Sequence, residues 1–99
     1  MSRAGKPLTV EWSGRFEKRL GALADNRRQS CLRAIEAIAH GQATPGMRVR
    51  PILPSKFYSE ARIASGDRLV FRVAEGVLYL IDVVEHDDIA RYAAERRGR

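Results

Sequence analysis

Apolar residues recur at helical spacing in the first half of this 99-residue chain and alternate with polar residues in the second half. Leu8, Val10 and Trp12 alternate with polar residues, which predicts a short first strand. Residues 13–24 and about 25–40 each carry their apolar side chains on one face. This periodicity predicts two amphipathic helices.

Polar residues and a glycine mark the ends of these two helices. Ser13 is placed to cap the first helix, and Asp25 or Asn26 is placed to cap the second. Gly41 is expected to end the second helix, because glycine adopts the left-handed conformation of a helix C-terminus without strain. The connection between the helices is short, so we expect an antiparallel helical hairpin.

After the Gly- and Pro-containing break at residues 41–46 the period changes from helical to alternating. Four strands are predicted, at residues 47–53, 57–64, 67–74 and 77–84. A short last helix is expected from Asp87 or Asp88 to about Arg97, with Asp88 as its cap.

These elements predict an α+β fold in a single domain over residues 1–99. We expect an N-terminal strand and the two-helix hairpin to pack on one face of a mainly antiparallel sheet of four to five strands. The short C-terminal helix follows the last strand.

Alternation assigns the strand side chains to two faces of the sheet. Ile63 and Leu69 both belong to an apolar face, and directly opposite residues of an antiparallel pair point to the same side. An odd number of residues must therefore connect these strands, and we expect a three-residue loop or a bulge at residues 65–66, with positive φ at Gly66. The expected apolar face of the first of these strands consists of Phe57, Ala61 and Ile63. The opposite face, away from the helices, gathers Glu60, Arg62, Arg68 and Arg72.

The last strand allows two registers. An odd-numbered loop at residues 74–76 places Asp82 opposite Arg68, and His86 continues that face. A two-residue turn buries Asp82 instead, which is unfavourable for a carboxylate without partners. We therefore expect the odd-numbered loop.

The chain is basic, with 18 Lys and Arg against 12 Asp and Glu, a formal net charge of +6 and an isoelectric point near 10.2. This balance favours a polyanionic partner, meaning nucleic acid, an acidic protein or an anionic surface. The excess of arginine matters because a guanidinium binds a phosphate through two parallel hydrogen bonds.

Other features exclude several classes of protein. Cys31 is the only cysteine, so no intramolecular disulfide forms, and no apolar run approaches the roughly 18 residues of a membrane span. We expect a soluble cytoplasmic protein with no membrane contact. His40, His86 and Cys31 lack the spacing of metal ligands, and no phosphate-binding or dinucleotide-binding glycine motif is present, so neither a metal nor a cofactor is expected.

Two helices, a Gly/Pro break and then the segments EARI, GDRLVFRV, a hydrophobic strand and HDDIARY follow one another along the chain. In this order they resemble the RelE/ParE superfamily of bacterial toxins. The chain is more similar to the RelE-type mRNA interferases than to the ParE-type gyrase poisons. The resemblance implies a toxin that cuts messenger RNA on the ribosome without a metal ion and is held inactive by an antitoxin.

The resemblance also implies site residues by position. Arg68 in DRLVF matches the phosphate-contacting arginine of the family, and His86 lies where members carry a histidine or arginine just past the last strand. Tyr92 matches the C-terminal tyrosine of some members. Candidate positions on the preceding strands are Glu60, Arg62 and Lys56, the last in a basic cluster that some members have. Asp87 and Asp88 depart from the pattern, because acidic residues beside a phosphate are unfavourable.

These residues suit RNA cleavage, in which the ribose 2′-OH is the nucleophile. Arg68, with Arg62 or Arg72, supplies charge to stabilise the phosphorane, and Lys56 adds to the phosphate-binding set. His86 is a candidate general acid or base, and Glu60 is the rival general base. Tyr92 is a candidate for stacking on a base or donating a proton.

Each candidate also has a purely structural interpretation. His86 is then a surface residue at a strand end, and Tyr92 packs with Ile89 and Ala93. Glu60 is then an ion-pair partner of Arg62 or Arg72. The sequence alone does not decide between these interpretations.

Two hypotheses follow. The first is the toxin of a type II toxin–antitoxin pair, a ribosome-dependent, metal-independent mRNA endoribonuclease whose partners are a separate antitoxin chain and messenger RNA on the ribosome. The alternative is a binding module, either a ParE-like inhibitor of gyrase or a catalytically inactive toxin-like protein.

Overall fold

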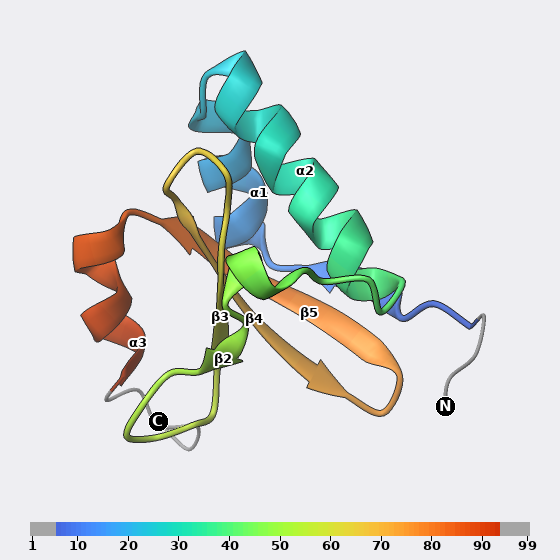
Figure 1. Ribbon diagram of the computed structural model, residues 1–99. Helices are drawn as coiled ribbons and strands as arrows, with labels where there is room; N and C mark the ends of the chain where they lie inside the picture. Colours follow the sequence, from blue (N-terminus) through green and yellow to red (C-terminus); the bar gives the residue numbers. More distant parts are fainter. Residues whose placement is uncertain (1–5, 94–99) are drawn as a thin grey trace.

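The computed structural model describes residues 6–93 as a five-stranded sheet with helices packed against it (Figure 1). The sheet order is β1-β5-β4-β3-β2, and β1 runs parallel to β5 while the other neighbours are antiparallel. The strands span Thr9–Trp12 (β1), Arg50–Pro51 (β2), Ser59–Arg62 (β3), Arg68–Ala74 (β4) and Val77–Val84 (β5).

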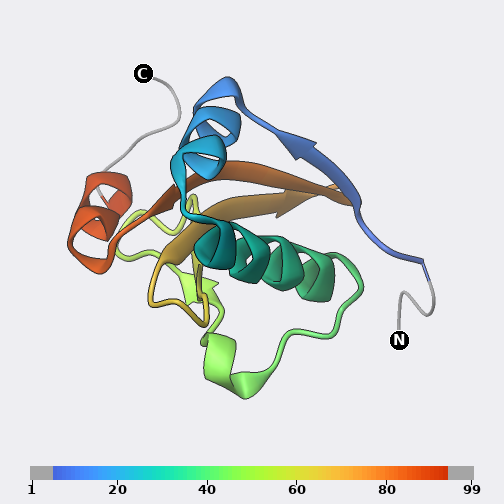
Figure 2. The ribbon, with the colours of Figure 1, turned by 90° about the horizontal axis from the view of Figure 1, so that it is seen from above.

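Two helices, α1 (Gly14–Ala22) and α2 (Asp25–Ala39), lie along one side of the sheet (Figure 2). A 3-10 turn, η1 (Pro45–Met47), precedes β2, and a second, η2 (His86–Ile89), leads from β5 into the short helix α3 (Ala90–Ala93). The predicted α+β class, with a helical hairpin and a short C-terminal helix, is confirmed.

The helix ends agree with the sequence at two of three positions. Ser13 caps α1 by accepting a hydrogen bond from the backbone N–H of Phe16, and its hydroxyl also donates to the carbonyl of Ile81. Gly41 follows α2 with a φ of 71°. The expected cap of α2 by Asp25 or Asn26 is wrong: the cap residue is Ala24 and no side chain caps it. Asp25 lies inside the first turn, where it forms an ion pair with Arg28.

The sheet separates two apolar clusters. The larger cluster lies under α1 and α2 and includes Phe16, Ile35, Leu69 and Leu80. The smaller cluster is formed by Ile52, Val70, Val84 and Tyr92 on the opposite face, which we call the outer face. Apolar packing on both sides of β4 and β5 therefore fixes the direction of every alternating side chain along them.

The connection from β3 to β4 is the predicted three-residue loop, residues 64–66, with a φ of 97° at Gly66. Arg62 consequently lies opposite Arg68 on the outer face. Asp67, which follows the loop, is buried and bound through both carboxylate oxygens by Arg27 of α2, at 2.6 and 3.0 Å. These hydrogen bonds hold the pKa of Asp67 below its ordinary value, so its charge is compatible with burial.

The strands before this loop are shorter than predicted. The expected strand 47–53 is reduced to two residues because η1 occupies its start and prolines, which have no N–H to donate, stand at positions 51 and 54. The expected strand 57–64 begins only at Ser59, since Lys56 has a left-handed φ of 62°. Alternation therefore does not extend to Phe57, which contacts Arg72 on the outer face instead of facing the helices as expected.

The expected odd-numbered loop between β4 and β5 is also wrong. The connection is a two-residue turn of Glu75 and Gly76, both with positive φ (51° and 81°), which is the backbone of a tight hairpin turn. A register shift between Val70 and Phe71 then inserts one extra residue, Ile81, into β5. Asp82 is therefore opposite Val70 rather than Arg68, but it remains on the outer face.

The segment after β5 begins with η2 rather than with a regular α-helix, and no side chain caps it, so the expected capping role of Asp88 is wrong. The expected extension of the helix to Arg97 lies outside the described residues. Between residues 6 and 93, none of the helices has the length and apolar character needed to cross a membrane.

The packing under α1 and α2 predicts a contrast between two residues of β4. Leu69 is fully buried, whereas Val73, which points to the same side, is 50% exposed. Leu69→Ala is expected to lower the free energy of unfolding by about 2–5 kcal/mol because it leaves a cavity. Val73→Ala is expected to change it by no more than about 0.5 kcal/mol. Urea unfolding measures both, and similar losses for the two variants would contradict the assignment of faces.

Candidate functional site

Arg68 is the centre of a polar cluster on the outer face, at the start of β4. Its Nη2 lies 2.7 Å from Nδ1 of His86, and its Nε lies 3.9 Å from Oε1 of Glu60. His86 comes from η2 and Glu60 from β3, so three elements converge on one guanidinium. The structure thus brings together three of the four residues that the resemblance implied as catalytic.

The contact with Arg68 indicates which ring nitrogen of His86 carries the hydrogen. A guanidinium only donates hydrogen bonds, so Nδ1 of His86 is the acceptor. The hydrogen of the neutral imidazole is then on Nε2. The His86 side chain is exposed, which leaves the ring accessible to a ligand on the outer face.

Glu60 is held between two arginines. Arg50 of β2 lies opposite it in the sheet and places its Nε 3.1 Å from Oε2, while Arg68 approaches Oε1. The side chain of Glu60 is only 9% exposed. Sequence reasoning missed Arg50, although an arginine and a glutamate on adjacent predicted strands were the signal that would have found it.

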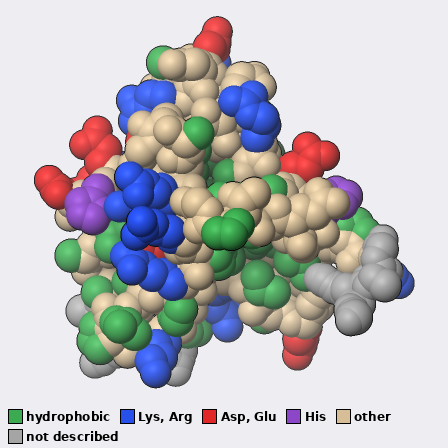
Figure 3. All heavy atoms as spheres, in the orientation of Figure 1, with side chains coloured by type: hydrophobic (Ala, Val, Ile, Leu, Met, Phe, Trp, Pro, Cys, Tyr) green, Lys and Arg blue, Asp and Glu red, His purple; other side chains and the backbone are tan. Residues whose placement is uncertain are grey.

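Two further arginines of the outer face have no carboxylate partner among residues 6–93. They are Arg62, which is exposed and lies opposite Arg68, and Arg72, whose guanidinium carbon lies 4.2 Å from the centre of the Phe57 ring. Lys56 is exposed in the loop before β3. Lys and Arg side chains gather beside a histidine over β3 and β4 (Figure 3). The positive charge of this face is therefore only partly compensated.

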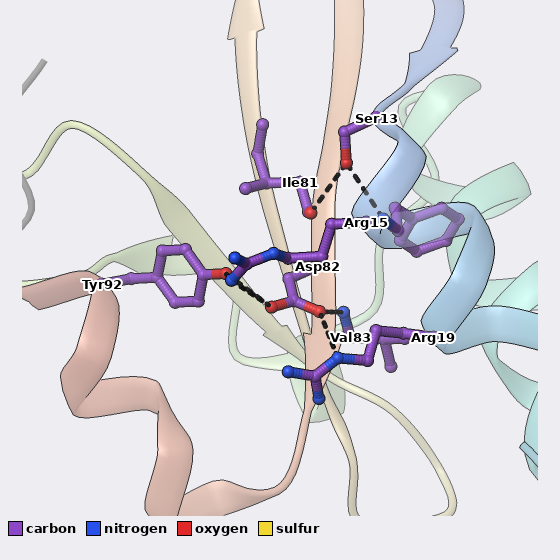
Figure 4. A network of polar contacts seen from close by, with 8 residues as sticks. Ser13, Arg15, Arg19, Ile81, Asp82, Val83 and Tyr92 are labelled. Atoms are coloured by element: carbon purple, nitrogen blue, oxygen red, sulfur yellow. Dashed lines mark hydrogen bonds and ion pairs between the residues drawn. The ribbon is translucent and has the colours of Figure 1, made fainter. Parts of the chain in front are cut away.

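Tyr92, the fourth catalytic candidate, lies apart from this cluster. It is only 3% exposed and packs in the outer apolar cluster with Ile89 and Ala93. Its hydroxyl donates a hydrogen bond of 2.5 Å to Oδ2 of Asp82 (Figure 4). In this arrangement no face of the phenol ring is open for stacking on a base.

Asp82 is fully buried and joins three elements through its carboxylate (Figure 4). Oδ1 accepts the backbone N–H of Val83 at 2.8 Å, beside the bulge of β5. Arg15 and Arg19 reach the carboxylate from α1 at 3.8 and 3.7 Å. Arg15 also donates to the hydroxyl of Tyr92 at 3.3 Å. A buried charge without such partners is strongly destabilising, so these contacts act together.

This network fixes the segment that carries His86. The segment leaves the sheet after Val84 and returns to it where Tyr92 binds Asp82. Residues 85–91 are thus anchored at both ends against β5. The Asp82 contacts therefore limit where η2, and His86 with it, lies relative to Arg68.

Burial and, to a smaller extent, the hydrogen bond to Asp82 raise the pKa of Tyr92 to about 12, while Arg15 opposes the shift. The protonated phenol is thus the form that the fold stabilises. Among the residues between positions 6 and 93, no group of three or more His, Cys, Asp or Glu side chains is arranged to hold a metal ion.

The Tyr92–Asp82 hydrogen bond predicts a pH-dependent stability. Because the folded pKa lies above the ordinary value of 10, the contribution of Tyr92 is complete below about pH 10 and is lost as pH rises toward 12. Tyr92→Phe should lower the free energy of unfolding by about 1–3 kcal/mol at pH 8, since a buried acceptor loses its donor. The difference in the free energy of unfolding between Tyr92→Phe and the wild type should become smaller at pH 11.

Urea unfolding at both pH values measures this difference, and Tyr79→Phe is the matched control, because Tyr79 is half-buried on the same strand as Asp82. A difference in unfolding free energy between Tyr92→Phe and the wild type that stays constant or increases at pH 11 would contradict the role of the Tyr92–Asp82 hydrogen bond.

No protein-family model matches this sequence. No curated protein matches it in sequence either. The fold, however, has clear counterparts among solved structures. YafQ from Escherichia coli superposes with a TM-score of 0.68 at 17% identity, over 83% of this chain and 97% of YafQ.

Two complexes provide further counterparts. A chain of the RelB–RelE antitoxin–toxin complex from Methanococcus jannaschii gives a TM-score of 0.63 at 16% identity, over 82% of this chain and 95% of its own length. A chain of the toxin–antitoxin complex RelBE2 from Mycobacterium tuberculosis gives a TM-score of 0.56 at 20% identity, over 81% of this chain and 99% of its own length. These likenesses cover nearly the full length of each counterpart. The chain therefore has the fold of the RelE-type toxins of toxin–antitoxin systems.

Proposed function

We propose that this protein is the toxin of a type II toxin–antitoxin pair and that it cleaves messenger RNA on the ribosome. The observation that carries the proposal is the contact of Arg68 with His86 on the outer face, which joins a phosphate-binding group to a proton-transfer group. The RelE-type fold supports it as an analogy, since a fold by itself does not fix an activity.

The charge of the outer face suits a polyanionic substrate. Arg62 and Arg68 lie directly opposite each other on adjacent strands, and only Arg68 has an acidic neighbour among the described residues. Positive charges on directly opposite residues repel each other, and an anion bound between them relieves this repulsion. A phosphate diester of RNA is such an anion, and each guanidinium can bind it through two hydrogen bonds.

Cleavage then proceeds without a nucleophile from the protein. The ribose 2′-oxygen attacks the adjacent phosphorus and forms a new O–P bond while the bond from phosphorus to the 5′-oxygen breaks. One proton leaves the 2′-OH and one is delivered to the departing 5′-oxygen. The products are a 2′,3′-cyclic phosphate and a 5′-OH, and this route has no inherent requirement for a metal ion.

His86 is the residue that we assign to the proton transfers. When the phosphate takes over the guanidinium of Arg68, Nδ1 of His86 loses its donor and accepts the proton of the 2′-OH. The imidazolium formed in this way supplies the proton for the 5′-oxygen. Arg68, with Arg62, stabilises the negative charge that develops on the phosphorane.

Glu60 and Tyr92 receive other roles in this proposal. Both carboxylate oxygens of Glu60 face guanidiniums and the side chain is nearly buried, so we assign Glu60 to positioning Arg68 and Arg50 rather than to proton transfer. Tyr92 is buried against Asp82, so we assign it to anchoring the segment that carries His86. Lys56 and Arg72 extend the phosphate-binding surface.

The proposed partner that controls the activity is a separate antitoxin chain. The net charge of +6 and the partly uncompensated arginines of the outer face favour an acidic or amphipathic segment laid over the site. Two of the structural counterparts are chains of antitoxin–toxin complexes, which supports the same arrangement here.

The proposal predicts ribosome-dependent cuts in a cell-free translation reaction. The purified protein is added, and the 5′ ends of the message are mapped by primer extension with and without ribosomes. We expect new cuts only when ribosomes are present. His86→Ala should lower the cleavage rate by roughly 10²–10⁴-fold, because it removes the acid–base group.

Arg68→Lys, which keeps the charge but not the planar guanidinium, should lower the rate by roughly 10²–10³-fold. His40→Ala is the matched control, because His40 is the other histidine of the chain and lies exposed at the end of α2. Cuts that persist in His86→Ala would overturn the site assignment. An intact message with translation still running would reject the nuclease proposal, and inhibition of DNA gyrase would then be the next activity to assay.

A further inference from the structure

Phe57 and Arg72 form a stacked pair at the end of the outer face away from His86. The guanidinium carbon of Arg72 lies 4.2 Å from the centre of the Phe57 ring. Both side chains are half-buried, so the pair borders solvent. The left-handed backbone at Lys56 turns the chain so that Phe57 lies over the sheet instead of continuing the alternation of β3.

Arg72 has a different kind of partner from six other arginines of the described residues. The arginines at positions 15, 19, 27, 28, 50 and 68 all face a carboxylate. Within residues 6–93 Arg72 has none, and its contact is the aromatic ring. A cation–π contact leaves the charge of the guanidinium in place and holds the group over the face of the ring.

A chain of aromatic contacts connects the pair to the outer apolar cluster. Phe57 contacts Tyr58 edge to face with ring centres 4.9 Å apart, and Tyr58 contacts Tyr92 in the same way at 5.3 Å. Tyr92 is fixed in turn by its hydrogen bond to Asp82. The stacked pair thus rests on the outer apolar cluster, which makes its surface pre-organised rather than mobile.

Resting on the proposed ribonuclease function, we propose that Phe57 and Arg72 form a stacking site for an unpaired nucleobase of the same RNA strand whose phosphate binds Arg68. Arg72 lies four residues after Arg68 on β4 and points to the same side. Strand geometry separates them by about 13 Å, at ~3.3 Å per residue. RNA bound at Arg68 and His86 continues along β4 to this pair.

An unpaired base fits this site better than an acidic peptide does. Bases of single-stranded RNA stack on aromatic rings and on guanidinium planes, and the pair joins one group of each kind at the border of the outer face. The positive charge of Arg72 and of nearby Lys56 attracts the phosphates on either side of the base. A peptide carboxylate uses the charge alone and leaves the ring without a partner.

The test measures binding without cleavage. The probe is a fluorescently labelled single-stranded RNA that is 2′-O-methylated throughout, which removes the nucleophile, and its counterpart is an abasic oligonucleotide of the same length. Fluorescence anisotropy gives the dissociation constants. Phe57→Ala is expected to weaken binding of the base-bearing RNA roughly 5- to 100-fold and to leave binding of the abasic strand nearly unchanged.

Two variants complete the design. Phe57→Trp keeps a stacking surface and is expected to bind the base-bearing RNA at least as tightly as the wild type. Leu53→Ala is the matched control, because Leu53 is a 62% exposed apolar residue of the same loop region that is not stacked on an arginine. Urea unfolding verifies that each variant is folded.

Failure of wild-type binding to the base-bearing RNA, or an equal effect of Phe57→Ala on both oligonucleotides, would overturn the stacking site. The result is separable from the nuclease proposal. If Phe57→Ala still cleaves the message and binds the base-bearing RNA as tightly as the wild type, the stacking site alone is rejected. If Phe57→Ala selectively loses binding of the base-bearing RNA, but the wild-type protein leaves the message intact in translation reactions, the nuclease proposal alone is rejected.

Discussion

The buried carboxylate of Asp82 is the interaction on which the rest of the outer face depends. A fully buried charge is tolerated only when its partners are fixed, and here they come from α1, β5 and α3. Tyr92 and the N–H of Val83 donate hydrogen bonds, and Arg15 and Arg19 balance the charge. The same contacts bring the chain back to the sheet after β5, and so hold His86 beside Arg68.

The bulge in β5 makes this arrangement compatible with the sheet. A two-residue turn without a bulge would turn Asp82 toward α1 and α2, into the larger apolar cluster. The extra residue, Ile81, reverses the alternation, so that Asp82 faces outward and Val83 packs under the helices in its place. Ser13 binds the carbonyl of Ile81 and at the same time caps α1, so the helix start and the bulge stabilise each other.

The arginines of the chain divide into two groups with different tasks. Arg27 compensates the buried Asp67, and Arg15 and Arg19 compensate Asp82, so these guanidiniums stabilise the fold. On the outer face Glu60 is shared by Arg50 and Arg68, and no carboxylate of the described residues meets Arg62 or Arg72. Positive charge in excess is thus concentrated beside His86, where the proposed substrate phosphate binds.

The sequence was sufficient for those parts of the fold that rest on local patterns. The Ser13 cap, the end of α2 at Gly41 and the three-residue loop at Gly66 follow from residue type and alternation, and the outer-face position of Arg62 and Arg68 follows from that loop. The β4–β5 turn was missed because alternation alone cannot reveal a bulge, which adds a residue after the register has been set. Phe57 was misplaced for a similar reason, since a single left-handed residue, Lys56, ends the alternation.

Within the candidate site, sequence and resemblance found Arg68, His86 and Glu60, which the structure brings together. Arg50 was missed although its pairing with Glu60 on adjacent predicted strands was readable, and the burial of Tyr92 on Asp82 was missed because it depends on the bulge of β5 and on an irregular segment. The surroundings of a side chain, rather than its type, separate a residue that anchors the fold from one that is open to a substrate.

The hydrogen bond from Arg68 to Nδ1 of His86 is the most direct point at which to test this account. Nitrogen-15 NMR of the His86 ring at alkaline pH reports which ring nitrogen carries the hydrogen. We predict only the tautomer protonated at Nε2 in the wild type, and a shift in Arg68→Ala to the mixture of both tautomers that a solvent-exposed imidazole adopts. A wild-type ring protonated at Nδ1 would contradict the arrangement of the site, because Arg68 could then not donate to it.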